Sequence, residues 1–414
     1  MKRDIIIIGG GVVGLMTAYS LHKAGRNVTV IDEGDITNCT SFGNAGLLSA
    51  FDKTPLSNPG VVLDTLKMMI KGESPVNVHP KLDIKLFKWL FKFVQSANED
   101  RLKRTLALFE KYGQITIDLY KQMQIEDGLD FDFHHKGMLS VFTEQESYEK
   151  KISKYNFVDN DRFEIFNKEQ IKDYLPCAND DIKGAILFKR NAHLDPKLVM
   201  SEMKRYLEQN GVEFILNEKI TDIKFKNKKV EKVSSVLNTY EADYFVLSTG
   251  YQTLLSDIRK KELVMTPAKG YSITFNMPKE LQPKTSTLFA DLFIVMTPRR
   301  NDVRLTSKLE LGSRNPKVVE KQINSIKENF KKYTLSFEME NIVEWSGFRP
   351  LTPNDMPLIG RDEEYDNLIY GMGLGWLGMT FAPSIGDIIS TLITTGQQNK
   401  NNDDILLFSG FYQG

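Results

Sequence analysis

The first 32 residues hold the pattern that most constrains how this chain folds. Ile5–Ile8 is a short run of β-branched apolar residues, typical of a strand buried on both faces of a parallel sheet. Residues 9–14 read GGGVVG and fit the spacing G-x-G-x-x-G, and apolar positions then recur at helical spacing until Gly25. Val28–Ile31 resembles a second strand, which ends at Asp32. The stretch therefore predicts a strand–turn–helix–strand unit.

The small and acidic residues of this unit suit the binding of a dinucleotide. Gly9 allows the tight turn, Gly11 lets a pyrophosphate approach the backbone, and Gly14 lets the helix pack closely on the strand. The phosphates then meet the N–H groups at the helix N-terminus. Asp32 lies where a carboxylate accepts hydrogen bonds from ribose hydroxyls. Because the strand, the helix and the acid all accompany the glycines, we predict that the chain binds a dinucleotide.

The composition indicates a globular protein with more than one core. At 414 residues, with 41% hydrophobic and 26% charged residues, two domains or one large discontinuous pair are expected. The formal net charge of zero gives no global field that would attract nucleic acid. Cys39 and Cys177 have no metal-binding or redox spacing and indicate a reducing compartment. No signal peptide precedes the first strand, and no apolar run approaches the roughly 18 residues of a membrane span, so we expect a cytoplasmic location.

The segment after Asp32 is rich in small and polar residues. It reads EGDITNCTSFGNAGLLSAF, and Gly43 and Gly46 indicate a loop that brings backbone close to another group. A nicotinamide-binding fold would continue with another helix and strand. The long loop is instead typical of FAD proteins, in which it follows the pyrophosphate toward the flavin, although an ordinary surface loop explains it equally well.

Two amphipathic helices are predicted next, at 59–72 and 81–95. In the second, the lysines at 81, 85, 88 and 92 form one stripe, opposite a wide apolar face that includes Trp89. Lysine beside Trp and Phe is typical of a helix lying in a membrane interface. The alternative, which we favour, is that this face packs on the protein itself.

The middle of the chain predicts that the nucleotide domain is discontinuous. Asp195-Pro196 begins a helix as cap and first-turn residue, and the strand 212–216 follows it. The stretch 242–250, ADYFVLSTG, then predicts a strand that ends in Thr249-Gly250. This is a crossover that returns to the first sheet. Strand patterns in series over 262–310 instead predict an antiparallel sheet of a different architecture.

The last informative segment covers residues 344–393. Arg349 stands between aromatic and proline-bound residues, which predicts a rigid loop. Gly371, Gly373, Gly375 and Gly378 then lead into a helix. A glycine-rich approach to a helix N-terminus is a second anion site, suited to the edge of a reduced flavin.

Six motifs in order resemble the D-amino-acid oxidase superfamily, and within it the D-amino-acid dehydrogenases of the small-subunit type. They are GGGVVG, SFGNAG, AHLDP, KGYSIT, GFRPLTPNDMPLIG and GMGLGWLGMTFAP. The resemblance implies an α/β protein with a Rossmann-like FAD-binding domain, similar to that of glutathione reductase. Its second domain is built on a mixed, largely antiparallel sheet that binds substrate. The FAD-binding domain would comprise 1–82, 168–257 and 338–414, and the substrate domain 83–167 and 258–337.

The same resemblance assigns residues to the cofactor and to the substrate. Arg349 would pair with the substrate carboxylate, and Tyr271 is equally well a substrate contact or an ordinary sheet tyrosine. The chain departs from the family near 372–377, where related branches carry a second arginine or a histidine. The residues expected to bind FAD are Gly9, Gly11, Gly14, Asp32, Ser41, Asn44, Ala45, Gly46, Ile220, Gly250, Gly378 and Met379.

We therefore expect FAD-dependent oxidative deamination, with hydride transfer from the α-carbon of an amino acid. A proline, hydroxyproline or other secondary-amine dehydrogenase is the alternative within this chemistry. An NAD-linked dehydrogenase and a non-catalytic flavin- or nucleotide-binding protein are alternatives of other classes. The expected partners are a small amino-acid or amine substrate and an electron acceptor, either a quinone, another carrier or O2, with peripheral contact to the inner face of the cell membrane. Neither nucleic acid nor a metal is expected.

Overall fold

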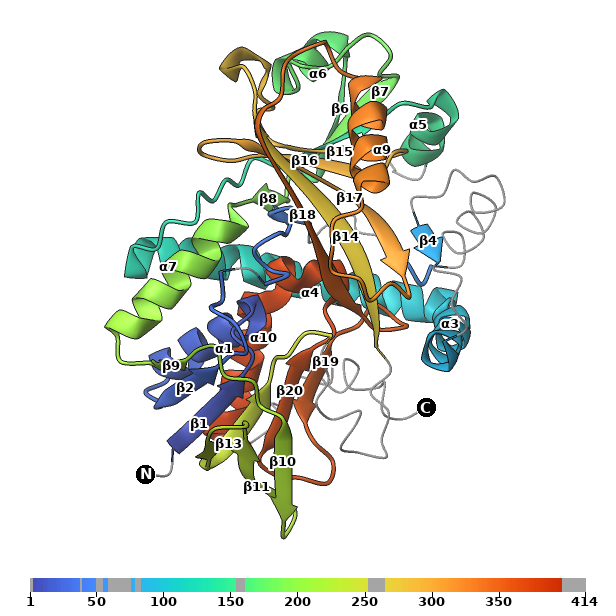
Figure 1. Ribbon diagram of the computed structural model, residues 1–414. Coiled ribbons are helices and arrows are strands. Elements are labelled where there is room, and N and C mark those ends of the chain that lie inside the picture. The colour runs from blue at the N-terminus through green and yellow to red at the C-terminus, as the bar shows by residue number, and fades with distance from the viewer. Residues whose placement is uncertain are drawn as a thin grey trace.

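The computed structural model describes residues 3–37, 39–49, 55–58, 76–78, 83–153, 161–251 and 265–396. Two large sheets dominate these residues (Figure 1). The lower part of the view holds a six-stranded sheet with helices against it, and the upper part holds a nine-stranded sheet. The amphipathic helix expected at 59–72 lies outside the described residues.

The six-stranded sheet confirms the expected dinucleotide-binding unit. Its order is β19-β20-β13-β1-β2-β9, and all its pairs are parallel except β19 with β20. Its central strand is the predicted apolar run, which is almost wholly buried. The strands are β1 (Arg3–Ile8), β2 (Val28–Ile31), β9 (Glu213–Ile215), β13 (Ala242–Leu247), β19 (Leu358–Arg361) and β20 (Leu368–Met372).

Alternate residues of β1 serve two cores, one on each face of the sheet. Ile5 and Ile7 pack with residues of four helices, whereas Ile6 and Ile8 face a small antiparallel sheet. The helices are α1 (Val12–Lys23), α4 (Glu99–Asp127), α7 (Pro196–Gln209) and α10 (Gly378–Thr395). The small sheet contains β10 (Asp222–Lys226), β11 (Lys229–Ser234) and β12 (Thr239–Tyr240). As predicted, Asp195 caps α7 by accepting a hydrogen bond from the Lys197 N–H, and Pro196 is its first residue.

The nine-stranded sheet is mixed and largely antiparallel, as expected. Within this sheet, only β5 with β15 and β4 with β17 pair in parallel among its described strands. The helix α9 (Glu320–Lys331) packs on one face through Ile323, Ile326 and Phe330. The strands are β4 (Val76–Val78), β5 (Met138–Phe142), β6 (Phe163–Phe166), β7 (Gly184–Phe188), β14 (Thr266–Asn276), β15 (Ser286–Phe289), β16 (Ile294–Pro298), β17 (Val303–Leu311) and β18 (Glu340–Leu351).

The strands of this second sheet do not all follow the domain limits set out above. β4, β7 and β18 fall in segments that the sequence analysis gave to the FAD-binding domain, yet they belong to the nine-stranded sheet. The residue ranges of the two domains stay a prediction. The remaining described elements are β3 (Leu47–Leu48), β8 (Ala192–His193), α3 (Ile84–Ser96), α5 (Gln145–Ile152), α6 (Lys168–Tyr174), and the 3-10 turns η1 (Lys279–Leu281) and η2 (Gly375–Leu377).

One apolar segment contradicts the expectation that no run approaches the length of a membrane span. Residues Gly375–Thr395 meet the length and composition of a membrane span, with a mean hydropathy of 1.2. However, 78% of that window is buried inside the protein, where α10 packs with α1 and α4. It is therefore a core helix of this domain, and its apolar character follows from burial on nearly all sides.

The helix α3 packs on the protein itself through the apolar face that includes Trp89, which is the alternative that we favoured. Leu86 and Trp89 are buried against Ala268 and Leu351, with Leu90 and Phe93 at the margin. The indole Nε1 of Trp89 donates a hydrogen bond of 2.9 Å to the Leu351 carbonyl. Trp89 is 2% exposed, so a membrane contact through Trp89 is wrong for this structure.

Candidate active site

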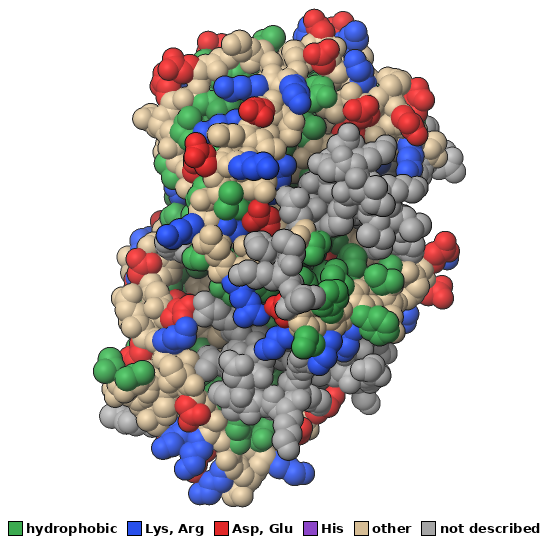
Figure 2. Space-filling model, turned by 45° about the vertical axis from the view of Figure 1, so that its right-hand side comes forward, with side chains coloured by type: hydrophobic (Ala, Val, Ile, Leu, Met, Phe, Trp, Pro, Cys, Tyr) green, Lys and Arg blue, Asp and Glu red, His purple; other side chains and the backbone are tan. Residues whose placement is uncertain are grey.

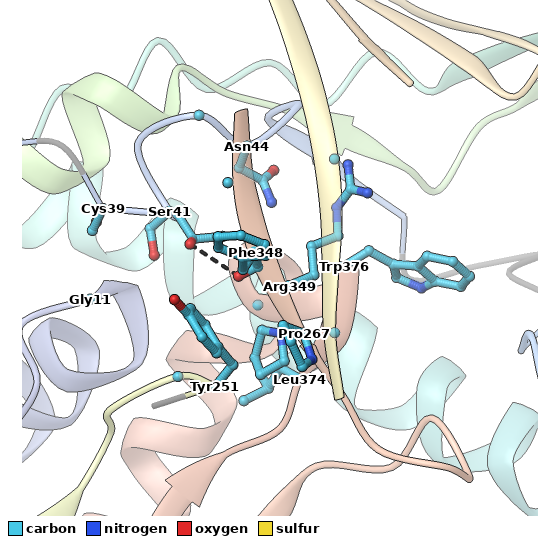
Figure 3. Close-up of a pocket in the computed structure, with 18 of the residues that line it drawn as sticks. Gly11, Cys39, Ser41, Asn44, Tyr251, Pro267, Phe348, Arg349, Leu374 and Trp376 are labelled. Atoms are coloured by element: carbon cyan, nitrogen blue, oxygen red, sulfur yellow. Dashed lines mark hydrogen bonds between the residues drawn. The ribbon is translucent and has the colours of Figure 1, made fainter. Parts of the chain in front are cut away.

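A large pocket runs between the two sheets and contains most of the expected site residues (Figure 3). Its volume is about 1280 Å³, above the roughly 300–1,000 Å³ of ordinary small-molecule sites. Gly11 and Ser41 lie on one side of the view, and Arg349 and Trp376 lie on the other. The pocket is therefore large enough to hold a dinucleotide together with a second, smaller molecule.

The glycine turn has the geometry that its sequence predicts. Gly9 has a φ of +105°, and a Cβ there would fall 2.5 Å from the Ser248 carbonyl oxygen. A Cβ on Gly14 would fall 1.9 Å from the Gly9 carbonyl oxygen, so this glycine permits close packing of α1 on β1 and lies outside the pocket lining. Gly11 is different, because its nearest neighbour would be the Ser41 hydroxyl at 3.6 Å. The open space lies on the pocket side, where a pyrophosphate is expected.

Asp32 and Ser41 tie the turn to its surroundings. The two Asp32 carboxylate oxygens accept hydrogen bonds from Gly10 N–H at 2.6 Å and Gly34 N–H at 2.8 Å. Since each carboxylate oxygen has a second lone pair, Asp32 retains acceptors for ribose hydroxyls in the pocket. The Ser41 hydroxyl accepts from the Val12 N–H at 3.1 Å, which joins the loop after β2 to the start of α1.

Arg304 of β17 holds this loop from the opposite sheet, a contact that the sequence analysis did not foresee. It is 3% exposed and donates to the carbonyls of Phe42 at 2.9 Å and Asn44 at 2.8 Å. Asn44 and Ala45 line the pocket. Gly46 does not, and its left-handed backbone instead allows close approach to the Leu194 carbonyl. No local pattern signals Arg304, because its role depends on the contact between the two sheets.

Residues that follow β9 and β13 contribute another part of the lining. Ile220 is buried in it, and its backbone N–H and C=O make no hydrogen bond to another described residue. Gly250 lines it with a φ of +62°. Ser248 was not predicted from the sequence, yet its hydroxyl is buried in the lining and has no partner among the described residues. Its position at the carboxyl end of β13 is the signal that could have found it.

The second glycine-rich segment also reaches the pocket. Gly378 and Met379 are the first residues of α10 and both line the cavity. The N–H groups of a first helical turn have no partner within the helix, and the helix dipole favours negative charge there. The start of α10 therefore directs these groups into the pocket beside the start of α1, where a Cβ on Gly378 would fall 3.9 Å from Cγ1 of Val12. Anion binding there stays a prediction.

Arg349 lies on β18 rather than in the loop predicted for it. Its Nη1 donates a hydrogen bond of 3.0 Å to the Lys308 carbonyl, and this is its only hydrogen bond to a described residue. No described carboxylate forms an ion pair with it. Burial lowers the pKa of the Arg349 guanidinium to about 10. A cation that is enclosed without a counter-ion is a strong binding site for an anion.

Tyr271 lines the same pocket, but its hydroxyl is already bonded. It donates to the Glu310 carboxylate at 2.8 Å, and the ring packs with Ile273 and Phe275 in the core of the second sheet. Burial and then the Glu310 hydrogen bond raise the pKa of Tyr271 above its usual value. The tyrosine therefore stays protonated, and its role as a substrate contact stays a prediction.

Comparisons with known proteins agree with this geometry. The model of the DAO family, described as "FAD dependent oxidoreductase", matches residues 4–392. The chain belongs to this family. It is 50% identical over 413 residues to D-amino acid dehydrogenase of Helicobacter pylori (strain J99 / ATCC 700824), with both chains fully covered. It is 28% identical to D-amino acid dehydrogenase of Vibrio vulnificus (strain CMCP6), over 97% of this chain and 98% of the relative.

Solved structures show the same fold. Glycine oxidase from Bacillus cereus ATCC 14579 superposes with a TM-score of 0.74 at 20% identity, covering 97% of this chain and 98% of the oxidase. L-proline dehydrogenase from P. horikoshii superposes with a TM-score of 0.71 at 17% identity, covering 96% and 95%. This member of the DAO family is an FAD-dependent oxidoreductase. The cofactor is therefore FAD and not NAD, and the chain is an enzyme and not a non-catalytic binding protein.

The residues present fit FAD. The open face of Gly11 suits the pyrophosphate, and the Ser248 hydroxyl, which no described residue satisfies, lies where a polar ligand atom would do so. Asp32 and Ile220 would hold the adenosine, and the start of α10 would meet the flavin. Arg349 then remains available to bind the second, smaller molecule in the pocket.

Proposed function

We propose that this enzyme oxidises a free D-amino acid, and the isolated cation of Arg349 carries this proposal. Its guanidinium has one hydrogen bond to the protein and no carboxylate partner among the described residues. A planar guanidinium is well suited to bind a carboxylate with two parallel hydrogen bonds. The 50% identity to a D-amino acid dehydrogenase over the whole chain supports the same substrate class.

The chain's residues would act mainly by orientation and by electrostatics. Arg349 would fix the substrate carboxylate and so direct the α-carbon toward the flavin, which reduces the entropic barrier. The N-terminus of α10 would stabilise negative charge that develops at the cofactor. FAD, when bound, supplies the acceptor for the hydride. Tyr271 does not act as a base, because its proton is held toward Glu310.

A secondary amine such as proline is the second candidate. Its carboxylate would meet Arg349 in the same way, and the likeness to a solved L-proline dehydrogenase supports the fold for such a substrate. A panel test separates the two. We would add D- and L-alanine, D- and L-proline and other amino acids to the purified holoenzyme without oxygen, and follow the flavin absorbance. Fastest bleaching by a primary D-amino acid supports the proposal, and bleaching by proline enantiomers alone contradicts it.

We also propose that the electron acceptor is a quinone and that α3 brings the enzyme to a membrane on its cytoplasmic side. A second apolar face of α3 stays outside the core, with Ile84 at 75%, Phe87 at 57%, Phe91 at 66% and Val94 at 59% exposure. In Figure 2, hydrophobic side chains gather on the right of the molecule, with Lys and Arg side chains beside them. Apolar side chains next to lysines suit a surface of anionic lipid headgroups.

The position of α3 supports this acceptor. Lys85 and Lys88 of α3 are exposed and line part of the large pocket. A membrane that touched α3 would therefore lie beside the entrance to the flavin, where a lipid-soluble quinone can approach.

The two cysteines, Cys39 and Cys177, are unpaired, which agrees with a reducing compartment.

A further inference from the structure

The strand β17 contains a bulge where it passes Arg349. Lys269 of β14 pairs with Glu310, and Tyr271 pairs with Ser307, so two steps along β14 match three along β17. One extra residue is therefore inserted in β17. Lys308 lies in this insertion and has a φ of 67°. Side chains other than glycine, asparagine and aspartate rarely adopt this left-handed backbone.

The bulge directs a backbone oxygen toward the substrate-binding arginine. The Lys308 carbonyl accepts the 3.0 Å hydrogen bond from Nη1 of Arg349. On its other side the guanidinium lies against Gly270, where a Cβ would fall 2.4 Å from three of its atoms. The bulge and the glycine together fix one edge of the guanidinium. Nε and Nη2 make no hydrogen bond to a described residue and stay available as a pair of donors.

We propose that Lys308 is a positioning residue, whose left-handed backbone in the β17 bulge holds Nη1 of Arg349 and presents the Nε–Nη2 edge to the substrate carboxylate. This inference rests on the proposed function, because it assumes that Arg349 binds that carboxylate. Bulges recur next to active sites, where they redirect a group that a regular strand would point elsewhere. The Lys308 side chain itself has no part in the hydrogen bond.

Substitutions at Lys308 can separate its backbone conformation from its charge. Lys308→Gly and Lys308→Asn remove the charge and tolerate a positive φ, whereas Lys308→Val removes the charge and resists it. The holoenzymes would be titrated without oxygen with the fastest D-amino acid of the panel and with its methyl ester, which lacks the carboxylate. Flavin bleaching gives an apparent Kd and a limiting rate for each. Lys308→Thr replaces the valine variant if that one does not fold.

The expected result is a carboxylate-specific loss. The valine variant should bind the amino acid at least tenfold more weakly than the glycine and asparagine variants, which should agree within about threefold, and all three should bind the ester alike. Equal amino-acid binding by Val and Asn variants would overturn the inference. Arg349→Met tests the proposed function separately: if it does not reduce the preference for the acid over the ester, the proposed function fails. If it reduces that preference and Lys308→Val does not, only this inference fails.

Discussion

The guanidinium of Arg349 lies directly against the α-carbon of Gly270 on the neighbouring strand. A Cβ at position 270 would fall 2.4 Å from Cζ, Nη1 and Nη2 of this arginine. Gly270→Ala should therefore displace the guanidinium and weaken substrate binding at least tenfold, while the FAD content is unchanged. Anaerobic titration of the flavin absorbance measures this apparent Kd.

The double mutant provides the control for this prediction. In an Arg349→Met background, Gly270→Ala should cause no further loss, since the guanidinium is already absent. Losses that add up in the double mutant would mean that Gly270 acts through the sheet in general and not through Arg349.

Two glycines of the first turn should separate cofactor binding from stability. Gly11→Ala meets its nearest atom at 3.6 Å, so the apoprotein should keep its thermal midpoint while FAD binds at least tenfold more weakly. Gly14→Ala meets the Gly9 carbonyl at 1.9 Å, so the apoprotein should lose about 1–3 kcal/mol of unfolding free energy. Thermal melts and FAD titrations of both variants check this, and equal behaviour of the two would refute the distinction.

Arg304 should couple the two sheets through the loop after β2, which contains Phe42 and Asn44. Arg304→Met removes both hydrogen bonds to the carbonyls of Phe42 and Asn44, and we expect FAD to bind about tenfold more weakly. Arg304→Lys can restore at most one contact well and should lie between the methionine variant and the original protein. The flavin circular dichroism reports the loop directly, and an unchanged spectrum in Arg304→Met would contradict the role.

Carboxylate binding should depend on pH through Arg349. Burial lowers the pKa of this guanidinium to about 10, so it is charged below that pH and neutral above it. Binding of propionate, which has no amino group to titrate, should be constant to about pH 9 and weaken above about pH 10. In Arg349→Lys the loss should begin at lower pH, because a buried lysine starts from a lower pKa than arginine. A flat profile in both proteins would argue against Arg349 as the anion site.

The exposed face of α3 should decide membrane binding. Replacing Phe87 and Phe91 together by serine should reduce cosedimentation with vesicles that contain anionic lipid, with little change in stability, because both rings are exposed. Serine at Val236 and Leu237, which are 87% and 80% exposed on another part of the surface, is the matched control and should bind vesicles normally. If the two double mutants bind alike, α3 is not the contact.

The cofactor half of this site could be predicted because its signals are local. Gly9, Gly11 and Asp32 fall within one strand–helix–strand unit, where spacing along the chain translates directly into position. The start of α10 is equally local. Gly14 and Gly46 are the exceptions, since both lie outside the pocket lining. Gly14 permits close packing of α1 on β1, and Gly46 permits close approach to Leu194.

The substrate half of the site depends on strand register, which the sequence does not reveal. Arg349 could be named by resemblance, but its partners are Gly270 on β14 and Lys308 on β17, and a one-residue slip in either strand would replace them. The same limit applies to α3. Its sequence predicts an amphipathic helix, but two apolar faces exist, and only packing against Leu351 shows which one is buried.

The most direct test of this account is the anaerobic spectrum of the purified holoenzyme and of Arg349→Met, each titrated with one D-amino acid and its L-enantiomer. We expect the D-enantiomer to bleach the flavin of the original protein. We also expect Arg349→Met to retain its FAD but to need at least a hundredfold more D-amino acid to bleach. Equal bleaching of both proteins, or a flavin that responds only to the L-enantiomer, would contradict this account.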